Sequence, residues 1–357
     1  MKLNLVEDIE TIPAVAKFNE HLSGRSVSKM EALTPIQLKH IIQDCGLAKL
    51  LLEKERGGLG YDLTTTMHVV QYVGEKAPSL GVMLCMHYHV VGVVALLPDS
   101  FPYADFMLEK VGRDNCLVAS AFAEGTPGQN IFVTHVTAVV DGDSVLINGH
   151  KKPCSMSNVA DFYLVSVENT QQQTGLALID GTDSNITRTD FWPTELLASS
   201  DSHRVDFNNL VLPAAMVSFT SEELMEEVFC VGMTLFTLMI NASYTGVATA
   251  LAKKLPADTL QNKKSLYIDI YGRLVQSYNS GYAIAHRLQQ GENVEHLMEQ
   301  SLVARFLNQI LLKEVGVLVK ENCGTFEYFA DPEFAYLVAV CDLIAFHPYR
   351  RNTFENL

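Results

Sequence analysis

The chain has 357 residues, 48% of them hydrophobic and 19% charged, and its formal net charge is −15. This composition is typical of a globular protein with a large core. The negative charge argues against binding to nucleic acids or anionic membranes, because both need a basic surface. The seven cysteines are scattered singly, without the spacing of a zinc site, and the first residues lack the apolar run of a signal peptide. We therefore expect a cytoplasmic protein with reduced thiols.

Residues 1–112 are predicted to form a helical domain. Asp62–Glu75 carries apolar residues at helical spacing, and Leu80–Leu97 is almost entirely apolar, which indicates a buried helix. This second helix contains His87 and His89. We interpret each of them as a hydrogen-bonded core histidine.

Residues 113–213 are predicted to form a small β-domain. Cys116–Phe122 is an extended apolar run, and Val133–Val140 is rich in β-branched residues. Between the latter and the next strand, Asp141-Gly142-Asp143 is a hairpin signal, because Asp and Gly tolerate the positive φ angles of such turns. Phe162–Val167 then predicts a further strand, so the region reads as a small sheet or barrel.

Residues 214–357 are predicted to form a helical bundle. Glu222–Lys254, Lys264–Gln290 and Val294–Lys320 each carry apolar residues every three or four positions. The apolar run inside the first of these contains polar residues, so we interpret it as a core helix and not a membrane span. Because a helix that is apolar all round must be covered on every side, we expect a homodimer or homotetramer.

This order of elements, and several motifs, resemble the acyl-CoA dehydrogenase family of flavoproteins. The loop Ala121–Gly128 resembles the family's loop beside the flavin, the hairpin Asp143–Lys151 its "INGxK" segment, and Glu321–Gly324 its "QxxGG" turn. The resemblance covers nearly the whole chain. It implies an α+β fold with an N-terminal helical domain, a middle β-barrel or sheet domain and a C-terminal four-helix bundle.

The resemblance also implies bound FAD. The cofactor-binding residues that it suggests are Phe122, Ala123, Gly128, Ser155 and Gly324. Glycine in the loop would let backbone N–H groups approach a flavin ring. Many family members carry an Arg-x-x-Phe-Gly segment for the flavin pyrophosphate. The matching region, residues 254–264, has lysines but neither Arg nor Phe, so this half of the cofactor site departs from the family.

A second departure concerns the catalytic base. The family removes a proton beside a thioester with a Glu, and both positions known for that Glu are vacant in this chain. The C-terminal segment Ile344–Asn352 contains no carboxylate, and Phe236 stands at the alternative position. His347 lies in the vacated segment and is the candidate catalytic residue, as a base or as a group that assists oxygen chemistry. The alternative is an ordinary exposed turn.

The resemblance therefore suggests an FAD-dependent oxidoreductase that acts on an acyl thioester without the usual Glu. It favours a short substrate on CoA or an acyl carrier protein, as in the formation of hydroxymalonyl or aminomalonyl units for secondary metabolites. A flavin-dependent monooxygenase on the same fold is the alternative. A third possibility is a non-catalytic subunit or scaffold.

Overall fold

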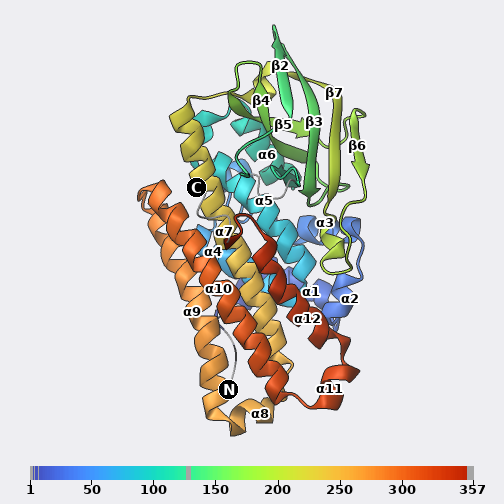
Figure 1. Ribbon diagram of the computed structural model, residues 1–357, viewed down its shortest axis with the longest axis vertical. Helices are drawn as coiled ribbons and strands as arrows, with labels where there is room; N and C mark the ends of the chain where they lie inside the picture. Colours follow the sequence, from blue (N-terminus) through green and yellow to red (C-terminus); the bar gives the residue numbers. More distant parts are fainter. Residues whose placement is uncertain (1–2, 4, 7, 126–129, 352–357) are drawn as a thin grey trace. The chain divides into compact units, whose positions relative to one another are not determined.

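The computed structural model describes residues 3, 5–6, 8–125 and 130–351 (Figure 1). Internal contacts divide the chain into two units. The helical unit comprises Met1–Leu33, Leu63–Cys85 and Thr237–Leu357, and the sheet unit comprises Thr34–Asp62 and Met86–Phe236. Two of the boundaries fall within the helices α5 (Pro78–Leu96) and α7 (Glu222–Lys253), so each of these helices contributes to both units. This division follows contacts and not sequence order, and the three predicted domains stay a prediction.

One sheet of eight strands dominates the sheet unit, in the order β6-β7-β3-β2-β4-β5-β8, with β1 paired to β4 (Figure 1). Every pairing except β1–β4 and β2–β4 is antiparallel. The strands are β1 (Val118–Ala121), β2 (Thr137–Asp141), β3 (Ser144–Cys154), β4 (Phe162–Asn169), β5 (Thr174–Asp180), β6 (Ile186–Thr189), β7 (His203–Pro213) and β8 (Val217–Ser218).

Two glycines explain the hairpin that joins β2 to β3. Gly142 adopts φ 57° in the tight turn, directly after Asp141, which pairs with Ser144. Gly149 lies at a register shift in β3 with φ 139°, and a Cβ there would stand 2.9 Å from the Cα of Val136. Only glycine fits such an approach between backbones. The predicted turn is therefore confirmed, and the strand after it is longer than the sequence suggests.

The helices of the sheet unit begin where their capping residues predict. In α3, Thr34 and Gln37 form a capping box, and Pro35 occupies the first turn. These helices are α3 (Pro35–Cys45), α6 (Ala104–Asp114) and parts of α5 (Pro78–Leu96) and α7 (Glu222–Lys253), with short 3₁₀ segments at Lys54–Arg56, Pro98–Ser100, Ala198–Ser200 and Ala214–Met216.

The helical unit is built from long helices. It contains α1 (Pro13–Leu22), α2 (Val27–Glu31), α4 (Leu63–Lys76), α8 (Ala257–Asn262), α9 (Lys264–Gln289), α10 (Val294–Asn322), α11 (Thr325–Ala330) and α12 (Pro332–Leu343), the remaining parts of α5 and α7, and 3₁₀ turns at Ile9–Thr11 and Ile344–Phe346. The α4 and α7 backbones approach closely at Gly246, where a Cβ would lie 2.0 Å from the Gln71 carbonyl oxygen. The predicted order of helices, sheet and helices is confirmed.

Two helices are long and apolar enough to cross a membrane by composition alone. The apolar windows of α5 and α7 are nevertheless 83% and 89% buried inside the chain. They are therefore core helices, as the sequence predicts. Because the chain itself covers α7, its apolar surface no longer argues for a second subunit, and the expected homo-oligomer needs other support.

Candidate active site

The loop that follows β1 is held by a buried lysine. Lys151 is fully buried, and its ammonium group donates to the Phe122 carbonyl oxygen at 3.3 Å and to the Glu124 carboxylate at 2.7 Å. It also donates to the hydroxyl oxygens of Thr134 at 2.8 Å and Ser166 at 2.9 Å. Lys151 therefore ties the end of this loop to two neighbouring segments of the sheet.

The charge on Glu124 is stabilised in the same cluster. Burial by itself would raise the pKa of Glu124, but hydrogen bonds from Lys151 and His135 outweigh it and lower the pKa to about 2. Burial lowers the pKa of Lys151 to about 8, although Glu124 opposes this shift. The two groups form an ion pair at neutral pH, so the loop backbone has a firm anchor.

Phe122 and Ala123 directly follow β1 and begin the loop. The Ala123 carbonyl accepts from the Lys152 N–H at 2.7 Å, which places this segment beside the end of β3. Phe122 and Ala123 are only half-buried. Gly128 lies outside the described residues.

Ser155 directly follows β3, three residues after Lys152, which bonds to the loop at Ala123. Its hydroxyl shares a hydrogen bond of 2.8 Å with the hydroxyl of Ser202, which in turn lies 3.0 Å from that of Ser200. A hydroxyl both donates and accepts, so Ser155 can add a bond to a ring nitrogen. Two N–H donors and this hydroxyl are the kind of polar edge that a flavin ring requires, and these residues fit such a group.

The two histidines of α5 have different surroundings. His87 is a core histidine, as predicted: its Nε2 lies 2.8 Å from the Ala48 carbonyl oxygen, and its Nδ1 accepts from the Val118 N–H at 3.1 Å. Burial lowers its pKa to about 4.

His89 faces the loop instead. Its Nε2 lies 3.0 Å from the Ser120 hydroxyl, and its ring contacts the rings of Phe122 and Phe236 at centroid distances of 6.1 and 5.4 Å. The sequence analysis treated His89 as structural. The structure adds His89 to the residues around the loop. Its position beside β1 depends on tertiary contacts, which the sequence does not show.

His347 lies in the helical unit, after α12, and does not form an exposed turn. The residue is half-buried, and its Nε2 lies 2.9 Å from the Tyr244 hydroxyl oxygen. The two rings meet edge to face at a centroid distance of 5.4 Å. Burial, and then the charge of Arg305, lower the pKa of His347 to about 3, so the imidazole is neutral at physiological pH.

Gly324 is the remaining predicted cofactor residue. It is exposed and caps α11, with its N–H donating to the Glu327 carboxylate at 3.0 Å. Its amide is therefore already used by its own helix. The assignment of Gly324 to the cofactor stays a prediction.

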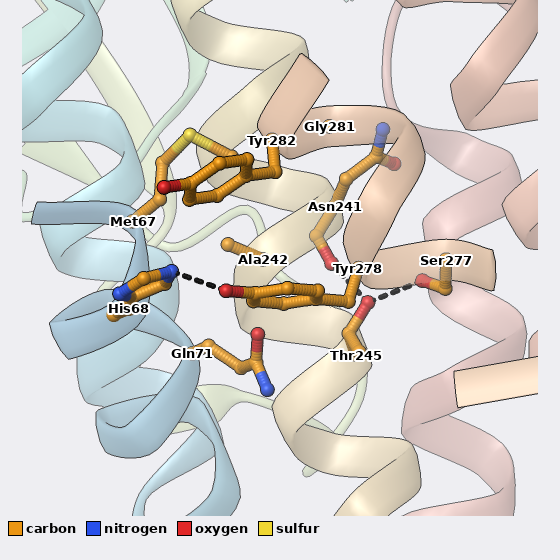
Figure 2. A pocket seen from close by; sticks show the side chains of 10 residues that line it. All are labelled: Met67, His68, Gln71, Asn241, Ala242, Thr245, Ser277, Tyr278, Gly281 and Tyr282. Carbon is orange, nitrogen blue, oxygen red and sulfur yellow. Dashed lines mark hydrogen bonds between the residues drawn. The ribbon is translucent and has the colours of Figure 1, made fainter. Parts of the chain in front are cut away.

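The helical unit also contains a small pocket between α4, α7 and α9 (Figure 2). On one side, the Tyr278 hydroxyl lies 2.6 Å from Nε2 of His68. Asn241 lies on the other side, and its amide finds no hydrogen-bond partner in the described part of the chain. The cavity volume is about 10 Å³, room for about one water molecule. It is too small for an organic substrate.

Comparisons with known proteins agree with this arrangement. No family model matches the chain. It is 28% identical to isobutylamine N-hydroxylase of Streptomyces viridifaciens over 322 aligned residues. The alignment covers 86% of this chain and 84% of the relative. The FMN-bound structure of TdsC, a dibenzothiophene monooxygenase from Paenibacillus sp. A11-2, superposes with a TM-score of 0.81 at 20% identity, over 98% of this chain and 94% of that one.

Butyryl-CoA dehydrogenase of Megasphaera elsdenii superposes with a TM-score of 0.83 at 14% identity, over 99% of this chain and 97% of that one. The chain therefore has the acyl-CoA dehydrogenase fold, which consists of N-terminal helices, a middle sheet and a C-terminal helical region. The chain is thus similar to proteins of this fold over nearly its whole length, as the motifs suggested.

Proposed function

We propose that the protein is a flavin-dependent monooxygenase that oxygenates a nitrogen or sulfur atom of a small, largely apolar substrate. The observation that carries this proposal is the neutral His347 in a segment without a carboxylate. Residues 344–351, and α7 from Val228 onward, contain no Asp or Glu. Removal of a proton from carbon needs a positioned base, ideally with a pKa near the working pH. A histidine whose pKa is about 3 is a poor base for that step.

A heteroatom has a lone pair, so its oxygenation requires no proton abstraction from carbon. When bound, reduced flavin supplies the two electrons with which one atom of O₂ enters the substrate and the other leaves as water. The 28% sequence identity to isobutylamine N-hydroxylase, over most of both chains, supports an amine as the first substrate to test. This monooxygenase replaces the acyl-thioester oxidoreductase as the favoured function.

The backbone N–H groups of Phe122 and Ala123 and the hydroxyl of Ser155 would hold the flavin ring. Lys151 keeps the loop in place through the Phe122 carbonyl oxygen and the Glu124 carboxylate. The sequence favours FAD, while TdsC is a relative with FMN bound. Denaturing the purified protein and identifying the released flavin by chromatography tests this point. If no flavin is released and neither form is taken up, a non-catalytic scaffold is the better explanation.

His347 acts as a neutral hydrogen-bonding group in this proposal. Its ring is oriented by Tyr244, which remains protonated because burial raises its pKa well above the usual value. We expect His347→Ala to lower the turnover number by about 10²–10³-fold, as for the loss of one positioned donor, with flavin content unchanged. His286→Ala changes an exposed histidine of α9 and serves as the control.

The deciding experiment compares two substrates with and without O₂. Flavin in the protein, reduced by a separate reductase and mixed with O₂ and isobutylamine, is expected to yield the N-hydroxylated product. Under anaerobic conditions, butyryl-, octanoyl- and palmitoyl-CoA are expected to leave the oxidised flavin unbleached. Rapid anaerobic bleaching by any of these thioesters would restore the dehydrogenase function, and oxygenation of no amine or thioether would refute the proposal.

A further inference from the structure

We infer that Arg305 is a positioning residue for His347: its guanidinium holds the chain on both sides of Pro348 and so presents the imidazole to Tyr244. The inference rests on the proposed function insofar as His347 is the group that acts on the substrate. It adds a residue from α10, in the middle of the bundle, to a site that the sequence places only in the C-terminal segment.

The geometry is that of a fork on two carbonyl groups. Nη1 of Arg305 donates to the His347 carbonyl oxygen at 2.7 Å, and Nη2 donates to the Tyr349 carbonyl oxygen. The planar guanidinium fixes both directions at once, which a flexible ammonium group cannot do. Arg305 is fully buried, so water does not compete for these bonds.

Arg305 carries its charge in the interior of the helical unit. Within the part of the chain that the structure describes, no ion pair involves Arg305, and its Nε has no hydrogen-bond partner. Burial lowers the pKa of Arg305 only to about 10, so it stays charged at neutral pH. A buried, unpaired charge destabilises a fold. An apolar side chain of similar volume would avoid this cost, so burial of the charge does not by itself account for the residue.

The contacts of Arg305 with the segment around His347 explain why an arginine occupies this position. Both hydrogen bonds of Arg305 go to residues 347–349, and its charge disfavours protonation of the neighbouring imidazole. Tyr244 of α7, which contacts the ring, keeps its proton, as do the thiols of Cys85 and Cys341 that act on Tyr244, because burial raises the pKa of all three. Arg305 is therefore the charge that acts on His347 from the helices packed around it.

Three variants separate the two effects of the guanidinium. Arg305→Gln keeps a donor for the carbonyl groups and removes the charge. Arg305→Lys keeps the charge and removes the planar fork. Arg273→Gln removes a guanidinium from the surface of α9, where it pairs with Glu314, and is the matched control.

The measurement is the protonation and tautomer of His347, followed by ¹⁵N NMR of the histidine-labelled holoprotein, with the His347 signal assigned by its loss in His347→Asn. In the unchanged protein and in Arg273→Gln we expect no titration of His347 between about pH 4 and pH 8. In Arg305→Gln the titration midpoint is expected to rise by about one pH unit or more, a tenfold change in the protonation constant. In Arg305→Lys the imidazole is expected to stay neutral while kcat falls about tenfold to a hundredfold at constant KM.

A folded Arg305→Gln protein whose His347 behaves as in the unchanged protein, or a folded Arg305→Lys protein with full kcat, overturns the inference. Tyr244→Phe covers the case in which both arginine variants fail to fold, because it leaves Arg305 in place. His347 must then remain neutral; titration in Tyr244→Phe alone would show that the phenol, and not Arg305, keeps it neutral. The NMR readout needs no turnover, so it stands even if the monooxygenase proposal fails.

Discussion

Replacing Lys151 with methionine would test the anchor of the loop after β1, which we propose to hold the flavin. The side chain is fully buried and donates to Phe122, Glu124, Thr134 and Ser166. Methionine has a similar shape but leaves the Glu124 carboxylate buried beside an apolar group. Breaking a buried ion pair from one side typically costs about 3–5 kcal/mol. We therefore expect Lys151→Met to lower the free energy of unfolding by about that amount.

A double-mutant cycle assigns this loss to the pair. Urea unfolding is followed by circular dichroism for Lys151→Met, Glu124→Gln and the double variant, with the free energy taken by linear extrapolation. The double variant removes both charges, so its loss is expected to be smaller than the sum of the single losses by about 1–3 kcal/mol. Flavin affinity is expected to fall in Lys151→Met, because the Phe122 carbonyl oxygen loses its donor.

The control is Lys110→Met, which breaks the exposed pair with Asp114 in α6 and is expected to change the free energy of unfolding far less, because water screens an exposed ion pair. A Lys151→Met protein within about 1 kcal/mol of the parent, with additive single changes, would show that the pair does not anchor the loop. Unchanged flavin affinity in a destabilised variant would separate the anchor from the cofactor site.

Two further predictions concern stability and assembly. Burial would raise the pKa values of Glu124 and Glu333, but hydrogen bonds led by those from Lys151 and Lys254 lower both to about 2; these groups therefore stabilise the fold above about pH 4.5, and that stability is lost as the pH falls toward 2. A urea midpoint that stays constant from about pH 5 to pH 2.5 would contradict this. We also predict a homodimer through exposed apolar residues spaced as in a coiled coil on α10, namely Val303, Leu307, Ile310 and Val317. Light scattering at micromolar concentration is expected to give the dimer mass, and Ile310→Glu a smaller mass; a monomeric parent protein would count against the prediction.

The sequence by itself determined the order of helices and strands. The Asp141-Gly142-Asp143 turn and the apolar spacing of the long helices depend on neighbours within a few residues, and the structure confirms both. The missing carboxylates were equally visible, because an absent residue type needs no three-dimensional information. These features depend on residues that are close in the sequence, so the sequence alone is enough to predict them.

The surroundings of His347 were decided only by the tertiary structure. The sequence placed His347 in a segment without a carboxylate but gave no sign of the charge that acts on its imidazole. That charge comes from Arg305, which lies 42 residues earlier in the chain. From the sequence, an arginine on a helix is predicted to be exposed, because most arginines are. Only the packing of the helices shows that Arg305 is buried. Tyr244 and His89 were likewise indistinguishable from core residues. A pKa depends on burial and on charges brought together by folding, so no pattern along the chain could have supplied it.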